Sequence, residues 1–112
     1  MAELDDNAGL EPQFCVRLDD DAPPGAEVVR LSGDLDLAGA DEARAVVDQA
    51  VSRAPATLTF DVTDLRFMDS SGIAVLVAAA QKVDTVILRN PSPAIHRLLG
   101  LAGLADVFDV QL

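Results

Sequence analysis

The chain contains no tryptophan or tyrosine, and its only aromatic residues are four phenylalanines among 112 residues. Because 50% of the residues are nevertheless hydrophobic, a core must be built mainly from valine, leucine, isoleucine and alanine. These residue types suit buried β-strands covered by alanine-rich helices. A chain of this length is enough for one domain that buries roughly 65% of the surface exposed when unfolded.

Basic residues are also scarce, since 8 Lys and Arg face 19 Asp and Glu and give a formal net charge of −11. Nucleic-acid binding depends on phosphate neutralisation by Lys and Arg, so we expect no nucleic-acid partner and favour a protein with a basic surface. The longest apolar run, residues 73–80, is far shorter than the roughly 20 residues of a membrane helix. The first residues carry no basic signal region. We therefore expect a cytoplasmic protein that does not enter a membrane.

Residues that bind metals or cofactors are few. Cys15 is the only cysteine, which excludes an intramolecular disulfide, and His96 is the only histidine. One Cys and one His far apart in sequence cannot form a zinc site by themselves, and no Gly-rich phosphate loop is present. We expect neither a metal nor a cofactor.

Hydrophobic periodicity predicts an α/β domain over residues 14–112, preceded by an acidic, flexible leader over residues 1–13. Strands are predicted at 14–18, at 27–32 with a sharp corner at Gly33, at 57–62 with Asp61 and Asp64 near its carboxyl end, at 85–89 and at 107–112. Helices are predicted at about 40–54, 71–81 and 93–103, the last capped by Ser92 with Ile95, Leu98, Leu99 and Ala102 inward. The connection over residues 82–84 is very short, so the second helix should end almost directly above the next strand. The order predicts a small sheet opened by a hairpin and continued by right-handed crossovers.

The central feature is the tetrapeptide Asp69-Ser70-Ser71-Gly72, which stands between a buried strand and a buried helix. Asp69, Ser70 and Ser71 are all good N-cap residues, and the first amides of the following helix would suit a phosphate. Gly72 lacks a side chain, which would allow a partner to approach Ser70 closely. The chemistry alone leaves an ordinary N-cap with two serines equally open.

Three segments resemble motifs of one family, and they occur in the family's order. Residues 67–73 (FMDSSGI) resemble the signature of the STAS domain in its anti-sigma factor antagonist branch, residues 31–36 (LSGDLD) its second-strand motif, and residues 90–94 (NPSPA) its entry to the last helix. The resemblance spans roughly residues 14–112. It implies a small mixed sheet of four to five strands, with about three helices mainly on one face.

The resemblance also implies a function. In that family the first serine after the aspartate is phosphorylated, which falls on Ser70. The unphosphorylated protein binds an anti-sigma factor, usually a serine kinase with a histidine-kinase-like ATPase fold, and so releases a sigma factor. Phosphorylation ends binding, and a PP2C-type phosphatase restores it. The resemblance places the partner surface at Asp34, Asp36, Asp69, Ser70, Ser71, Gly72 and Ile73.

Other functions are less well supported. An enzyme with Ser70 as nucleophile would need His96 as its base, but Met68 stands where a nucleophile elbow has glycine, so we expect no enzyme. Asp34 and Asp36 could form a carboxylate site with Asp69, although such aspartates more often cap turns. The resemblance also fits a STAS subunit of a larger assembly, such as an ABC-type lipid transport complex or a stress-signalling scaffold. The absence of any fused domain favours the antagonist.

Overall fold

The computed structural model describes residues 14–112, and the leader predicted over residues 1–13 lies outside the described residues. Two strands are followed by alternating helices and strands, as predicted. The elements in chain order are β1 (Phe14–Leu18), β2 (Ala26–Leu35), α2 (Leu37–Val51), β3 (Thr57–Met68), α3 (Ser70–Ala80), β4 (Thr85–Arg89), α4 (Pro93–Leu101) and β5 (Asp109–Gln111).

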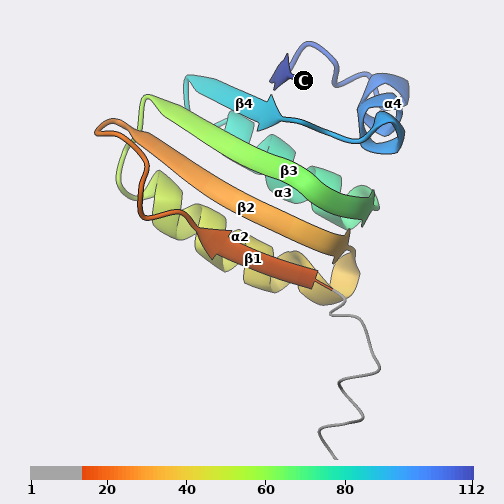
Figure 1. Ribbon diagram of the computed structural model, residues 1–112, viewed down its shortest axis with the longest axis horizontal. Coiled ribbons are helices and arrows are strands. Elements are labelled where there is room, and N and C mark those ends of the chain that lie inside the picture. The colour runs from red at the N-terminus through yellow and green to blue at the C-terminus, as the bar shows by residue number, and fades with distance from the viewer. Residues whose placement is uncertain (1–13) are drawn as a thin grey trace, which may run out of the picture.

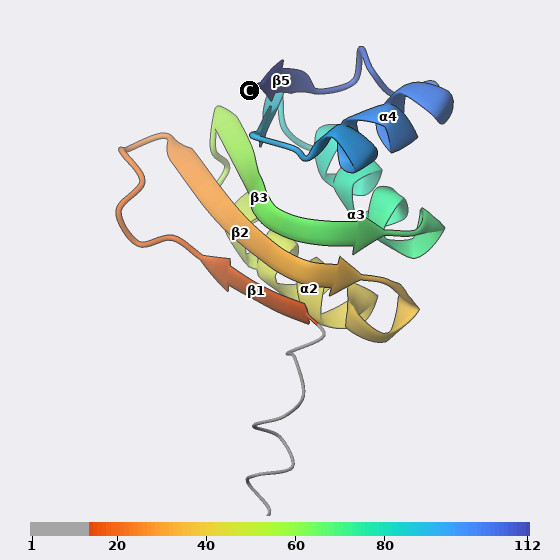
Figure 2. The same cartoon turned by 45° about the vertical axis from the view of Figure 1, so that its right-hand side comes forward.

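The strands form one mixed sheet in the order β1-β2-β3-β4-β5. β1 is antiparallel to β2, whereas every other neighbouring pair is parallel. Helices α2 and α3 lie side by side behind the sheet in Figure 1, and α4 lies beyond β4 at the other end of the sheet (Figure 2). The predicted fold class, a small mixed sheet with three helices mainly on one face, is confirmed.

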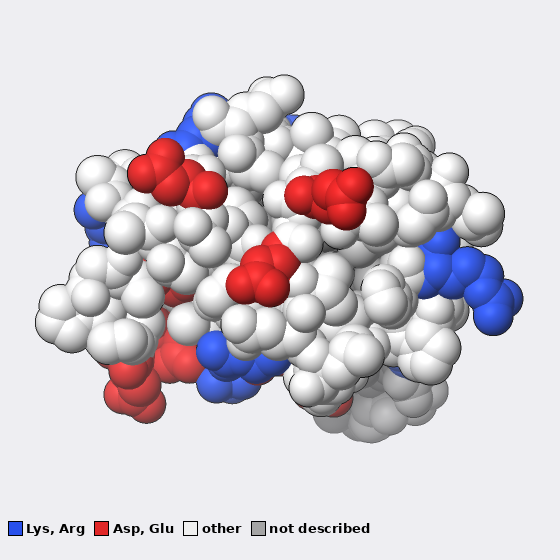
Figure 3. All heavy atoms as spheres, turned by 90° about the horizontal axis from the view of Figure 1, so that it is seen from above, with Lys and Arg blue, Asp and Glu red and all other residues white. Residues whose placement is uncertain are grey.

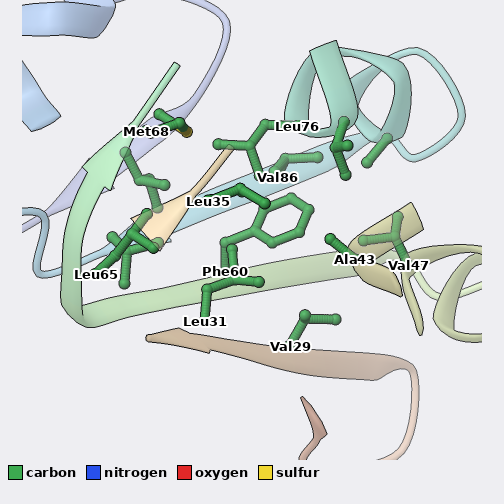
Figure 4. Packing of buried hydrophobic residues seen from close by; sticks show 14 of the residues in the cluster. Val29, Leu31, Leu35, Ala43, Val47, Phe60, Leu65, Met68, Leu76 and Val86 are labelled. Atoms are coloured by element: carbon green, nitrogen blue, oxygen red, sulfur yellow. The ribbon is translucent and has the colours of Figure 1, made fainter. Parts of the chain in front are cut away.

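The core lies between the sheet and helices α2 and α3. Figure 4 shows the Phe60 ring of β3 pointing from the sheet into this layer, close to Leu35 and Ala43. Because no larger aromatic side chain is available, small and branched aliphatic residues fill the remaining space. The other buried residues of this layer include Val29, Leu31, Val47, Ala50, Leu58, Val62, Val75, Leu76, Ala79, Val86 and Leu88.

The second strand is longer than predicted. Gly33 does have a positive φ of 85°, but it lies inside β2 and does not end it, so the predicted corner is wrong. The pairing with β3 shifts between Arg30 and Ser32 and again after Gly33, and each shift inserts one extra residue into β3. Glycine suits such a bulge because it adopts positive φ without a steric penalty. The bulges let β2 continue to Leu35.

The third strand is also longer than predicted, since it runs on to Met68. Asp61 therefore lies in the middle of β3, not near its carboxyl end as predicted. β4 pairs only with the first five residues of β3, from Thr57 to Asp61. Beyond Asp61, β3 pairs with β2 alone. The ends of β2 and β3 therefore extend together past β4 (Figure 2).

The remaining helix predictions are largely confirmed. α4 is capped by the Ser92 hydroxyl, which accepts the Ile95 N–H at 3.2 Å, with Pro93 as its first residue. Ile95 and Leu99 are buried and Leu98 is half-buried, but Ala102, which was predicted to face inward, is exposed and follows the last helical residue, Leu101. The connection from α3 to β4 is as short as predicted.

Candidate functional site

Ser70 is the first residue of α3, directly after the strand β3 and its cap residue Asp69. This confirms the predicted junction between strand and helix. The Ser70 side chain is exposed, and its hydroxyl makes no hydrogen bond to any residue of the described range 14–112. The hydroxyl is therefore accessible to another protein. His96 is exposed on α4 and makes no hydrogen bond to Ser70, so these two residues do not form a nucleophile and base pair.

Asp69 is the residue that caps α3, although the sequence offered three candidates. Its φ and ψ of −107° and −169° are extended, and one carboxylate oxygen accepts the N–H groups of Ser71 at 2.8 Å and Gly72 at 3.3 Å. The Asp69 carbonyl accepts the Ile73 N–H at 3.0 Å. Ser71 is thus not a cap, which leaves partner contact as its predicted role.

The cap changes what a phosphate on Ser70 would meet. The sequence predicts that the first amides of α3 are free to hold the phosphate. In the structure the carboxylate of Asp69 already occupies two of them. A phosphate would have to displace that carboxylate or remain beside it in solvent, because both anions need the same donors.

A second helix begins next to Ser70. Leu35, the last residue of β2, pairs with Met68, the last residue of β3, and the Leu35 carbonyl accepts the Asp69 N–H at 3.1 Å. Asp36 follows at once and caps α2 by accepting the Ala38 N–H at 3.1 Å. Asp34 and Asp36, which the resemblance places on the partner surface with Ser70, thus lie in a segment joined to the start of α3, and their contact with a partner stays a prediction. The two capping aspartates make this end of the sheet acidic.

Gly72 is buried, and the structure provides an internal reason for a glycine there. A Cβ at this position would lie 2.6 Å from Met68 Cγ, 2.7 Å from Leu35 Cγ and 2.9 Å from the Leu35 carbonyl oxygen. Close packing of α3 against the end of β2 therefore requires glycine. The partner contact expected at Gly72 stays a prediction.

The remaining predicted site residues lie around this corner. Ile73 is half-buried and packs against the core, and Ser71 is half-buried. Asp34 pairs with Phe67 across the strands, and its carboxylate lies 3.5 Å from the guanidinium of Arg66. Asp34, Asp36 and Asp69 do not form a metal site, and no cluster of metal-binding side chains occurs within residues 14–112.

An ion-pair network on the uncovered face of the sheet was not foreseen. The buried Asp61 carboxylate accepts a hydrogen bond from Arg30 at 2.8 Å and from the Thr63 hydroxyl at 2.7 Å. Arg30 also donates to Asp19 at 2.8 Å, and Arg89 lies 3.8 Å from Asp61. Periodicity places alternate residues on this face but does not say which of them pair. The network joins the first hairpin to the middle of the sheet.

Exposed apolar residues at the Ser70 end were also missed. Leu37 opens α2 and Phe67 precedes Met68, and both are exposed. The bulges in β3 disturb the alternation that would otherwise assign each side chain to a face. None of the helices within residues 14–112 is long and apolar enough to cross a membrane.

Comparison with known proteins agrees with this geometry. The model of the STAS domain family matches residues 17–112. The chain belongs to the STAS domain family. An anti-sigma F factor antagonist from Paenibacillus polymyxa is 33% identical over 91 residues, and the match covers 77% of this chain and 78% of that protein.

Solved STAS structures share the fold. An anti-sigma factor antagonist from Mycobacterium paratuberculosis superimposes with a TM-score of 0.78 at 25% identity, covering 88% of this chain and 85% of that one. The phosphorylated form of the Bacillus cell fate determinant SpoIIAA gives a TM-score of 0.68 at 25% identity, covering 88% and 92%. The resemblance to the antagonist branch of the STAS family is thereby confirmed.

Proposed function

We propose that this STAS protein is an anti-sigma factor antagonist controlled by phosphorylation of Ser70. The observation that carries the proposal is the exposed hydroxyl of Ser70 at the first residue of α3, which has no hydrogen-bond partner among residues 14–112. The relatives named anti-sigma factor antagonists and the phosphorylated form of SpoIIAA support it. The protein acts by binding and not as an enzyme, and it works in the cytoplasm, where sigma factors act.

In its unphosphorylated form the protein binds an anti-sigma factor that is a serine kinase with a histidine-kinase-like ATPase fold. The sigma factor that this kinase held is thereby released. The partner surface consists of the corner around Ser70, with contributions from Asp34, Asp36, Asp69, Ser70, Ser71, Gly72 and Ile73.

The kinase then phosphorylates the bound protein, and this modification dissociates the complex. The Ser70 oxygen attacks the γ-phosphorus of ATP, its proton passes to a base of the kinase, and ADP leaves. A PP2C-type phosphatase reverses the modification by hydrolysing the phosphoserine with water, which yields serine and inorganic phosphate. The phosphate adds about −1.5 to −2 charges next to the carboxylate of Asp69. The phosphate group also adds bulk at the point where the kinase packs against Ser70 and α3, so it obstructs that contact and the complex dissociates.

A single experiment tests the proposal. Each serine-kinase anti-sigma factor encoded in the same genome is purified and mixed with this protein, with ADP or with ATP, and the complex is measured by size-exclusion chromatography. We expect one kinase to bind with ADP and to release the protein with ATP, with the phosphate mapped to Ser70 by mass spectrometry. The Ser70→Ala variant should bind and remain bound with ATP. Modification of Ser71 in place of Ser70 would contradict the assignment, and binding to none of the kinases would overturn the proposed function.

A further inference from the structure

Two large apolar side chains are exposed at the end of the sheet that carries Ser70. Leu37, the first residue of α2, exposes 76% of its surface, and Phe67 in β3 exposes 50%. Exposed apolar residues are ordinary when they are scattered singly. These two, however, come from different elements, the start of α2 and the end of β3. Both elements meet at the corner where the Asp69 N–H donates to the Leu35 carbonyl.

The strand register fixes this common location. Phe67 is paired with Asp34, and the next pair, Met68 with Leu35, is the last of the two strands. Leu37 follows Leu35 by two residues, and Ser70 follows Met68 by two residues. In sequence, Leu37 and Phe67 are thus each within three residues of Leu35 or Met68, the last residues of the two strands that position Ser70.

The internal packing of the corner does not involve these two side chains. Leu35 and Met68 are buried in the core, and they already fill the space beside Gly72. Leu37 and Phe67 are not part of the core cluster. Their apolar surface is therefore left for contact with another molecule.

The charge around the corner indicates the kind of partner. Asp36 and Asp69 each direct a carboxylate to the start of a helix, while the carboxylate of Asp34 is paired with Arg66 at 3.5 Å. Protein interfaces commonly combine apolar anchors at the centre with a charged rim. Carboxylates at the rim favour a partner with basic side chains in the facing positions.

We propose that Leu37 and Phe67 are the apolar anchors that hold the serine-kinase anti-sigma factor, whose facing surface has an apolar pocket rimmed by basic side chains. This inference rests on the proposed function. A kinase must bring the γ-phosphate of ATP to the Ser70 hydroxyl, so its surface must cover the side chains that end at the same corner. Leu37 and Phe67 are the large exposed apolar residues there.

Other exposed apolar residues provide a control. Leu101 exposes 81% of its surface and is the last residue of α4. Figure 3 views the molecule from the side on which α4 lies in Figure 1 and shows isolated acidic side chains on a mostly uncharged surface. α4 lies beyond β4, with β3 between it and α2 (Figures 1 and 2), so it is not one of the elements that form the corner around Ser70. Leu101→Ala removes a similar exposed apolar side chain to Leu37→Ala, but from a helix that is not part of the corner around Ser70.

The test measures binding of each variant to the purified kinase by calorimetry, with ADP present so that Ser70 remains unmodified. The kinases are the serine-kinase anti-sigma factors encoded in the same genome. Leu37→Ala and Phe67→Ala should each raise Kd at least tenfold, which corresponds to about 1.4 kcal/mol, and Leu101→Ala should leave Kd within about twofold. Circular dichroism and urea unfolding should show that all three variants fold as the original protein does.

The outcomes separate the inference from the proposed function. If the original protein binds a kinase and both Leu37→Ala and Phe67→Ala bind equally well, the anchors are wrong and the proposed function stands. Equal weakening by Leu101→Ala would also overturn the inference, since the effect would not depend on position. If the original protein binds no kinase, the proposed function fails and the inference fails with it.

Discussion

The backbone N–H of Asp69 donates to the carbonyl oxygen of Leu35 at 3.1 Å, so the start of α3 is tied to the end of β2. Residues far apart in sequence thereby position Ser70. The same carbonyl oxygen lies 2.9 Å from where a Cβ on Gly72 would be. One backbone group of β2 thus determines both where α3 begins and how closely it packs.

Gly72→Ala should therefore destabilise the protein, although alanine is the better helix former. The added methyl group would meet the Leu35 carbonyl, which cannot move without disturbing the strand pairing. Such overpacking costs typically about 1–3 kcal/mol. Urea unfolding measures the difference. Gly100→Ala in α4 is the matched control, because a Cβ there meets nothing within 4 Å. This variant should gain roughly 0.5–1 kcal/mol from helix propensity. A neutral Gly72→Ala would contradict the packing argument.

Substitutions at Ser70 should separate folding from binding. Because the Ser70 hydroxyl has no hydrogen-bond partner within residues 14–112, Ser70→Ala should unfold at the same urea concentration as the original protein. It should keep the kinase affinity but lose the release by ATP. Ser70→Glu should fold normally and bind at least tenfold more weakly, a difference of about 1.4 kcal/mol, as measured by calorimetry. One carboxylate imitates a phosphate poorly, so the decisive sample is the enzymatically phosphorylated protein. If that protein bound the kinase with the full affinity of the unphosphorylated protein, the proposed switch would be wrong.

The ion pair between Asp19 and Arg30 should make the free energy of unfolding depend on pH. The backbone N–H of Asp21, followed by the Arg30 guanidinium, lowers the pKa of Asp19 below its ordinary value of 3.8. A carboxyl whose pKa is lower in the folded state contributes stability above its unfolded pKa, and that stability is lost as pH falls through the folded pKa. Asp19→Asn should thus be less stable than the original protein at neutral pH, and the difference should vanish below the folded pKa. A pH series of urea unfolding curves checks this. A difference that persists undiminished in acid would rule out the charge as its cause.

Much of the fold could be predicted because local patterns determine it. The strand at residues 85–89 and the Ser92-Pro93 helix start depend on alternation and cap chemistry that neighbouring residues display. The site at Ser70 was predictable for the same reason, since a strand pattern changes to a helix pattern around it. The resemblance to the STAS family supplied the proposal that Ser70 is the residue that is phosphorylated.

What could not be predicted depends on contacts between distant residues. The extension of β2 beyond Gly33 requires a partner strand that runs to Met68, and the two bulges that keep them in register leave no sequence pattern. The choice of Asp69 as the cap depends on Leu35, which holds its backbone. The reason for glycine at position 72 likewise appears only when β2 and α3 are packed together.

The last prediction concerns competition between Asp69 and a phosphate on Ser70. In the original protein the Asp69 carboxylate holds the N–H groups of Ser71 and Gly72, so these two donors are already occupied. Asp69→Ala removes the cap and should cost about 0.5–2 kcal/mol of stability. The same change frees both amides, and a phosphate on Ser70 could then take over the capping role. Phosphorylation should therefore stabilise Asp69→Ala by roughly 0.3–1 kcal/mol, the usual worth of an anion at a helix start.

The measurement compares the original protein and Asp69→Ala, each with serine or with phosphoserine incorporated at position 70, by urea unfolding at low ionic strength. Phosphoserine should leave the original protein unchanged or slightly less stable, because the phosphate lies beside a carboxylate that already occupies the donors. In Asp69→Ala it should recover part of the lost stability, and added salt should reduce that recovery through screening. Asp109→Ala, an exposed change in β5 away from Ser70, should respond to phosphorylation as the original protein does. An identical effect of phosphorylation with and without the Asp69 carboxylate would mean that the two anions do not share the amides of α3.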